Sequence, residues 1–150
     1  MNARKRDGCP LHGPGVRPEH LVGRRLERVL ASWHRHGSDA PYGPLDIWLV
    51  DSEGDSTLVT TGSDWCLIVE SSTPFEGYDM RECGRVEVVP DRNETPFAAR
   101  VGETVLAVRE EWEQDDGRTA LEIVFDSGTV VRCGSRAGDL VLSARGDHGG

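Results

Sequence analysis

The sequence predicts a mainly β fold made of two tandem three-stranded meanders, related by a pseudo-twofold axis and packed as a sandwich or a flattened barrel. Three pairs of similar segments support this prediction. Residues 22–33 return as 101–112, 79 positions later; residues 45–49 return as 121–125, 76 positions later; and residues 57–63 return as 129–135, 72 positions later. Because the segments keep one order and only the loops between them differ in length, we interpret the chain as two copies of one supersecondary unit.

The chain of 150 residues is long enough for one domain with a sizeable core. We expect a disordered tail over residues 1–18, where Gly and Pro leave no room for a helix or a strand. A single duplicated β domain is expected over residues 19–145, and a flexible end over residues 146–150. Within the domain, copy one takes residues 21–70, an insert takes residues 71–90 and copy two takes residues 100–143.

The first segment of each copy allows two interpretations. Apolar side chains at positions 22, 26, 29 and 33 fit one face of a helix, as do those at 101, 105, 108 and 112. However, Gly stands second in both segments, and the segments that follow alternate as strands do. We therefore prefer a strand at the start of each meander and keep a helix as the alternative.

The strand interpretation also predicts which side chains share a face, since alternate residues of a strand point the same way. In copy one these are Val29, Ala31 and Trp33. In copy two they are Leu106, Val108 and Trp112, so Trp33 and Trp112 are expected to be equivalent and buried in the core.

The later segments of each copy are predicted to form hairpins. Residues 45–50 alternate as a half-buried strand does, and the polar residues 51–56 turn it back. Residues 121–125 do the same before the turn at 126–129. Between the copies, residues 73–84 and a strand-like stretch at 85–89 have no counterpart in the repeat, and such an insert on a rigid scaffold is a place where function can be carried.

Charge distinguishes the two ends of the chain. Residues 1–36 hold eight Arg or Lys against three Asp or Glu, while the rest holds nine against twenty-three, for a net charge of −9. An acidic body repels the phosphates of nucleic acids and attracts a basic partner. The candidate binding residues are the acidic turn Asp51, Glu53 and Asp55, the insert residues Tyr78, Asp79 and Glu82, and the acidic run Glu113, Asp115 and Asp116.

Metal and cofactor sites are not predicted. The pairs Cys9 with His12 and His34 with His36 have ligand-like spacing, but no second pair stands at the distance that a zinc site needs. With no export signal, the four cysteines are expected to be reduced. No apolar run approaches the length of a membrane span, so we expect a cytoplasmic protein that does not enter a membrane.

Three stretches carry a resemblance: Leu-Val-Gly-Arg-Arg-Leu at 21–26, Tyr-Asp-Met-Arg-Glu-Cys-Gly-Arg at 78–85 and Leu-Glu-Ile-Val-Phe-Asp-Ser-Gly at 121–128. Over most of residues 20–143 the chain resembles small uncharacterised actinobacterial proteins with a duplicated β-meander. The shared motifs are strand starts and turns, so the resemblance implies a fold and assigns no functional residue.

Two hypotheses for the function follow. The first is a non-enzymatic protein-binding module, immunity-like or accessory, that presents the acidic loops around residues 51–55 and 110–116 to a basic protein. The alternative is a small-molecule-binding or catalytic β fold that uses the insert at 73–84 and a cavity between the two copies. We favour the first, chiefly because the acidic run over residues 110–116 suits a basic partner and because no stretch carries a catalytic motif. The oligomeric state stays open.

Overall fold

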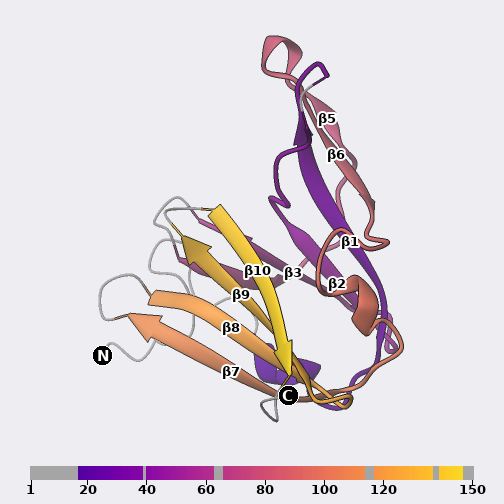
Figure 1. Ribbon diagram of the computed structural model, residues 1–150, viewed down its shortest axis with the longest axis vertical. Helices are drawn as coiled ribbons and strands as arrows, with labels where there is room; N and C mark the ends of the chain where they lie inside the picture. Colours follow the sequence, from indigo (N-terminus) through magenta and orange to yellow (C-terminus); the bar gives the residue numbers. More distant parts are fainter. Residues whose placement is uncertain (1–16, 39, 63–65, 114–116, 137–138, 147–150) are drawn as a thin grey trace.

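The computed structural model describes residues 17–38, 40–62, 66–113, 117–136 and 139–146. They form two antiparallel sheets that are not closed into a barrel (Figure 1), which confirms the mainly β, sandwich-like fold. The first sheet has the strand order β4-β3-β2-β1-β6-β5, from β1 (Leu26–Arg35), β2 (Ile47–Asp51), β3 (Ser56–Thr61), β4 (Leu67–Ser71), β5 (Tyr78–Asp79) and β6 (Arg85–Pro90). The second has the order β10-β9-β8-β7, from β7 (Val105–Glu113), β8 (Gly117–Phe125), β9 (Thr129–Arg136) and β10 (Asp139–Gly146).

Each copy is a meander of four strands, one more than predicted. The additional strands are β4 and β10, which pair with β3 and β9 along their whole length. A short 3₁₀-helix precedes each meander, η2 (Pro18–Leu21) before β1 and η4 (Ala98–Arg100) before β7. A strand, not a helix, therefore starts both meanders, but it begins at Leu26 and Val105, four residues later than the matched segments.

A pseudo-twofold relation is visible in the hydrogen bonds that join the two copies. The backbone N–H of Gly23 donates to the carbonyl of Val105, and the N–H of Gly102 donates to the carbonyl of Leu26. Gly23 and Gly102 have positive φ values of 87° and 94°, a backbone conformation that is costly for a residue with a side chain. The shared Gly at the second position thus marks the point where the two copies hydrogen-bond to each other.

The pairing register corrects the alignment of the later segments. Ile47 pairs with Ala31 and Val59, and its counterpart by the same pairing is Leu121, 74 positions later. The alignment of the two copies by sequence instead matches Leu121 with Leu45, two residues before Ile47. Because side chains alternate along a strand, a shift of two leaves every side chain on the same face, so the similarity remained visible.

The core lies between the two sheets and draws on both copies. Its largest members include Phe97, Phe125, Ile47 and Leu121, which are nearly inaccessible to solvent. Phe97 and Phe125 meet edge to face, with ring centroids 6.4 Å apart. The two copies therefore form one folding unit with a common core.

The prediction that both repeated tryptophans are buried is wrong. Trp33 is partly exposed and packs against the edge of the core, while Trp112 is partly exposed under the guanidinium of Arg118, 5.2 Å from the ring centre. The predicted inward face of copy two is also wrong at Leu106, which is 55% exposed. A β-bulge between Val105 and Ala107 places this extra residue outside the core, and copy one has the same bulge between Leu26 and Arg28.

The outer faces of the two sheets have different chemistry. In the first sheet, Leu30, Trp48 and Leu58 form a cross-strand row over β1, β2 and β3. Trp48 is fully buried, because the insert crosses the sheet and places the ring of Phe75 edge-on against it, with centroids 5.0 Å apart. The insert therefore covers an apolar outer face.

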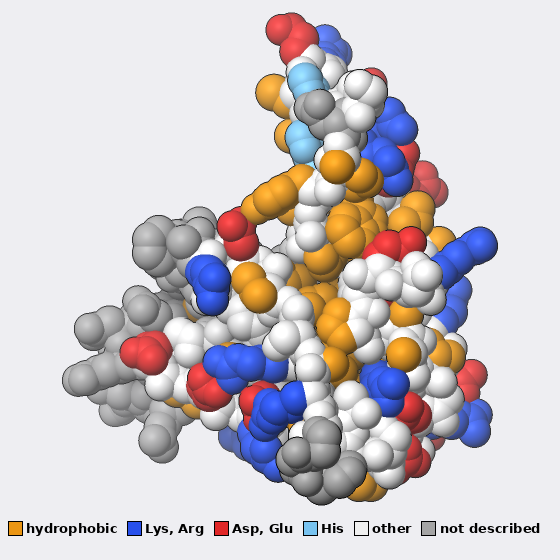
Figure 2. Space-filling model, viewed as in Figure 1, with side chains coloured by type: hydrophobic (Ala, Val, Ile, Leu, Met, Phe, Trp, Pro, Cys, Tyr) orange, Lys and Arg blue, Asp and Glu red, His pale blue; other side chains and the backbone are white. Residues whose placement is uncertain are grey.

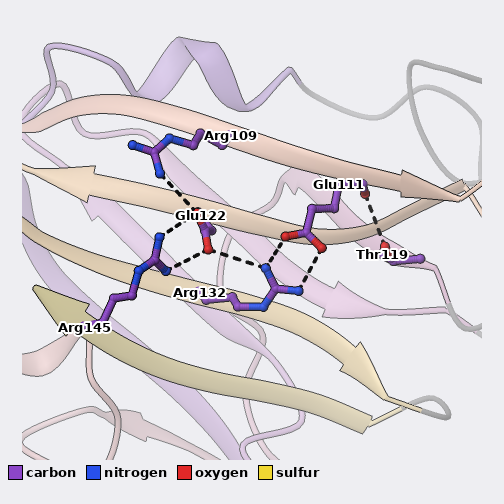
Figure 3. A network of polar contacts seen from close by, with 6 residues as sticks. All are labelled: Arg109, Glu111, Thr119, Glu122, Arg132 and Arg145. Carbon is purple, nitrogen blue, oxygen red and sulfur yellow. Dashed lines mark hydrogen bonds and ion pairs between the residues drawn. The ribbon is translucent and has the colours of Figure 1, made fainter. Parts of the chain in front are cut away.

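In the second sheet, the positions equivalent to this row are Arg109, Glu122 and Arg132. Glu122 lies at the centre of an ion-pair network (Figure 3), where Arg145 donates to it at 2.8 Å and Arg109 at 3.4 Å. Arg132 bridges Glu122 and Glu111. These bonds hold the pKa of Glu122 below its ordinary value, chiefly through the hydrogen bond from Arg145. This outer face is charged and needs no cover.

Candidate functional site

An arm formed by residues 33–38 and 78–87 extends beyond the sandwich (Figure 1). It consists of the end of β1 and the insert elements β5, η3 (Arg81–Cys83) and the start of β6. His34 and His36 donate from Nε2 to the carbonyls of Cys83 and Glu82, and so join the two sides of the arm near its tip. The histidine pair therefore has a structural role here.

Two glycines allow the strands of the arm to approach closely. A Cβ atom at Gly84, where φ is +94°, would lie 2.1 Å from the carbonyl oxygen of Arg35. At Gly77 it would lie 2.3 Å from the carbonyl oxygen of Val86. Both distances are far below van der Waals contact with backbone, so the path of the insert along the arm requires glycine at each position.

Exposed apolar side chains gather on the arm and at its base. In Figure 2 hydrophobic side chains run from the base of the arm along one side of it, while charged side chains of both signs lie at its tip, on its other side and over the sandwich. Tyr42 and Tyr78 are 54% and 53% exposed, and Phe75 and Met80 are also exposed. Phe75 and Tyr78 lie against each other with ring centroids 6.0 Å apart, so the part of the insert that covers Trp48 is continuous with the exposed patch.

A cleft of about 410 Å³ opens at the base of the arm. It lies where copy one, the insert and copy two meet. Its lining residues are Tyr42, Gly43, Pro44, Leu45, Asp46, Thr60, Thr61, Tyr78, Asp139 and Leu140. Two tyrosines and two carboxylates are thus brought together from three separate parts of the chain, and the described lining residues include no basic residue.

The polar groups of the cleft are held by defined contacts. The hydroxyl of Tyr42 donates to Oδ1 of Asp139 across the gap between the copies, and this bond raises the pKa of the phenol. The fully buried hydroxyl of Ser32 donates to Oδ2 of Asp46 at 2.7 Å and accepts from the Asp46 backbone N–H at 2.9 Å. Each carboxylate is therefore fixed through one oxygen, and its second oxygen accepts no hydrogen bond from the described residues.

The backbone around Tyr42 is equally well defined. Tyr42 and His34 exchange two backbone hydrogen bonds of 2.8 and 2.9 Å, which tie the loop before β2 to the end of β1. At Gly43, with φ of +146°, a Cβ atom would lie 2.9 Å from the N atom of Leu45 and 3.2 Å from the ring of Trp33. Trp33 thus has a role that its position in the repeat did not indicate, since it supports the wall of the cleft.

The predicted acidic turn is mostly occupied with its own structure. Asp51 is buried and accepts hydrogen bonds from the backbone N–H groups of Glu53 and Asp55. Arg24 donates to Asp51 at 3.0 Å and to Asp55 at 2.5 Å. Asp51 and Asp55 are therefore neutralised within the chain, and Glu53 is the exposed carboxylate that remains in this turn.

The other predicted binding residues are distributed over two regions. Tyr78 lines the cleft, Asp79 accepts from the backbone N–H of Arg81, and Glu82 lies exposed at the tip of the arm. Glu113 is exposed at the end of β7. Asp115 and Asp116 lie outside the described residues.

The two predicted acidic loops lie at opposite ends of β7. Val105, the first residue of this strand, donates its backbone N–H to the carbonyl of Arg24, the residue that binds Asp51. Glu113 is the last residue of β7, eight positions after Val105, and eight residues of extended chain span about 26 Å. The two acidic loops are therefore separated by the length of this strand and do not form one continuous acidic patch on it.

Three residues of the cleft, Tyr42, Asp46 and Asp139, were missed by the sequence comparison. Tyr42 lies in the polar loop between β1 and β2, for which the sequence predicts no function. Asp139 is the first residue of β10, a strand that the sequence did not predict. The available signal was weak, because an exposed Tyr between Pro and Gly is also common in ordinary turns.

Among the described residues, no group of three His, Cys, Asp or Glu side chains is arranged to hold a metal ion. Cys66 is disulfide-bonded, so the expectation of four reduced thiols is wrong, while Cys83 and Cys133 are free. Burial raises the pKa of the Cys133 thiol to about 12. No helix in the described part of the chain is long and apolar enough to cross a membrane.

Comparison of the chain with protein-family models, curated proteins and solved structures found no match. The resemblance stated from the sequence therefore stays a prediction. The candidate site rests on the geometry of the arm and the cleft.

Proposed function

We propose that this chain is a non-enzymatic protein-binding module whose binding surface is the arm together with the cleft at its base. The observation that carries the proposal is the cluster of exposed aromatic and apolar side chains there, Tyr42, Phe75, Tyr78 and Met80. Tyr, Phe and Met are enriched in the centres of protein interfaces, where they contribute large contact areas. An exposed patch of this kind on a projecting element is typical of a docking surface.

The electrostatic balance favours a basic partner. The chain carries a net charge of −9, and the described lining of the cleft contributes two carboxylates and no basic side chain. A negative surface steers a basic protein towards it and raises the association rate at low ionic strength. The acidic run at the end of β7 would add to this long-range attraction without direct contact. A cytoplasmic site of action and an immunity-like or accessory role stay predictions from the sequence.

Capture of partners from a lysate of the native host by matched variants tests the proposal. Tyr78→Ala with Met80→Ser removes apolar surface from the arm, and Leu106→Ser with Val141→Ser removes comparable exposed surface from the second sheet. All four side chains are exposed, so both variants are expected to fold. The arm variant should lose the captured protein, and the control should retain it. Equal capture by the two variants would contradict the proposal.

The size of the cleft supports one alternative, a small-molecule site. A volume of about 410 Å³ falls in the range of ligand pockets in proteins. Thermal shift with a metabolite library distinguishes the two functions. A small molecule whose stabilising effect is lost in Thr60→Val and in Asp46→Asn would favour the alternative. Protein capture that is retained by both variants would favour the arm as a docking surface.

A further inference from the structure

We propose that the cleft binds the cationic side chain of an arginine from the partner, between the rings of Tyr42 and Tyr78 and against the carboxylates of Asp46 and Asp139. This inference rests on the proposed function and adds the chemical group that the cleft selects. Three properties of the cleft support it: its aromatic walls, its fixed carboxylates and the absence of a competing cation among its described lining residues.

The aromatic walls suit a planar cation. Tyr42 and Tyr78 both line the cleft, and about half of the surface of each side chain is open to solvent. The faces of aromatic rings attract guanidinium groups, and the attraction grows where water is displaced. Tyr78 also contacts the ring of Phe75, so only the exposed part of each tyrosine ring is available to a ligand.

The carboxylates suit the donors of the same cation. Asp46 is oriented by the fully buried hydroxyl of Ser32, and Asp139 is oriented by the phenol of Tyr42. Since one oxygen of each group is already bound, the other is left to accept a hydrogen bond. Arginine offers several N–H groups in a fixed plane and can reach more than one acceptor, which a lysine ammonium does less well.

Among the described residues, no basic side chain lines the cleft to neutralise these carboxylates. Arg136 is the cross-strand neighbour of Asp139 in the β9–β10 hairpin, but it is not part of the lining. This differs from the acidic turn around Asp51, where Arg24 already occupies the carboxylates. In the described part of the chain, Arg24 thus occupies the carboxylates of the acidic turn, whereas those of the cleft meet no basic side chain.

Nuclear magnetic resonance of the isotope-labelled full chain tests the inference with two short peptides. One is acetyl-Gly-Ser-Arg-Ser-Gly-amide, and the other carries citrulline, a neutral analogue of nearly the same shape, in place of arginine. At millimolar concentrations, typical for a single side chain in a pocket, the arginine peptide should shift the amides of Tyr42, Asp46, Thr60 and Asp139. The citrulline peptide should shift them little.

Asp46→Asn and Asp139→Asn keep one carbonyl oxygen for the existing hydrogen bond, remove the charge and replace the second oxygen, the proposed acceptor, with an NH2 donor. Each should weaken binding of the arginine peptide about two- to fivefold. Asp126→Asn removes an exposed charge outside the cleft and should leave binding unchanged. Three outcomes would overturn the inference: no shifts, equal shifts with both peptides, or shifts centred on residues 51–55 or 110–113.

Failure of this inference can be separated from failure of the proposed function. If the peptides do not bind the cleft but the arm variant still loses its captured protein, the arm is a docking surface and the cleft is not an arginine site. If the arm variant retains its capture, the proposed function itself is contradicted, whatever the peptides do.

Discussion

The two copies have the same backbone pairing and opposite outer faces. Where copy one has the row Leu30, Trp48 and Leu58, copy two has Arg109, Glu122 and Arg132 at the equivalent positions. The inner faces remain apolar in both, because they share one core. The fold is therefore determined by the inner faces and the turns, and the outer faces are left to differ.

The difference explains why the insert lies where it does. An uncovered row of Leu, Trp and Leu would expose a large apolar patch, which monomeric proteins rarely tolerate. Phe75 covers Trp48 at the centre of this row, and the same segment then continues into β5 and the arm. Copy two keeps its outer face in water through ion pairs. The candidate binding surface is thus attached to the copy whose outer face needs a cover.

The largest expected effect is a difference in stability between variants at the equivalent positions Trp48 and Glu122. Trp48→Ala should lower the free energy of unfolding by about 3–5 kcal/mol, because it leaves a cavity under the insert. Glu122→Ala removes ion pairs to partly exposed arginines and should cost about 1–2 kcal/mol. Urea denaturation of the two variants measures both. Equal costs would mean that the two outer faces do not differ in the way described.

A smaller effect should be the same in both copies. Gly54 and Gly128 occupy equivalent places in the two hairpins, with φ of 86° and 90°. Alanine at either position forces a side chain into the left-handed region and should cost about 1 kcal/mol. A difference of more than about 1 kcal/mol between Gly54→Ala and Gly128→Ala would contradict the equivalence of the two hairpins.

The smallest expected effect concerns pH and salt. The pKa of Glu122 is lowered chiefly by the hydrogen bond from Arg145, and that of Glu111 by the hydrogen bond from Arg132. A lowered pKa means that the stabilisation is complete above the ordinary value near 4.5 and is lost as the pH falls through the folded value. High salt should weaken the same network by less than about 1 kcal/mol, since its arginines are partly exposed.

Glu122→Gln is the control, because it cannot ionise. The difference in stability between the wild type and this variant should shrink between neutral pH and pH values below the folded pKa. Asp91 acts in the opposite direction, since burial raises its pKa, but its contribution is common to both chains and cancels in the difference. A difference that does not change with pH would show that the network contributes no ionic stabilisation.

Much of the fold could be predicted because the inner-face pattern repeats. Ile47 and Leu121 alternate with their neighbours in the same way, and a two-residue error in the alignment kept their faces correct. Both missed strands, β4 and β10, are edge strands, and only part of β10 is buried. In β4 Leu67 and Val69 are buried, so its alternation was present in the sequence and was overlooked. Edge strands are selected less strictly for alternation, so their sequence pattern is weaker.

The candidate site could be predicted only in part. Tyr78 was identified because the insert has no counterpart in the repeat, but its neighbours in the cleft come from distant parts of the chain, such as Tyr42 and Asp139. Asp51 was selected for its charge, although Arg24, 27 residues earlier, neutralises it. Sequence patterns show local composition, whereas the occupation of a carboxylate depends on contacts made across the fold.

Hydrogen exchange of the complex between this chain and its captured partner tests the central claim most directly. If the insert-bearing side is the binding surface, amides of residues 42–46, 78–84 and 139–140 should exchange more slowly in the complex. Amides around Glu122 and Arg132 on the second sheet should be unchanged. Protection centred on the second sheet, or on residues 51–55, with the arm unaffected, would contradict the assignment of binding to the arm and the cleft.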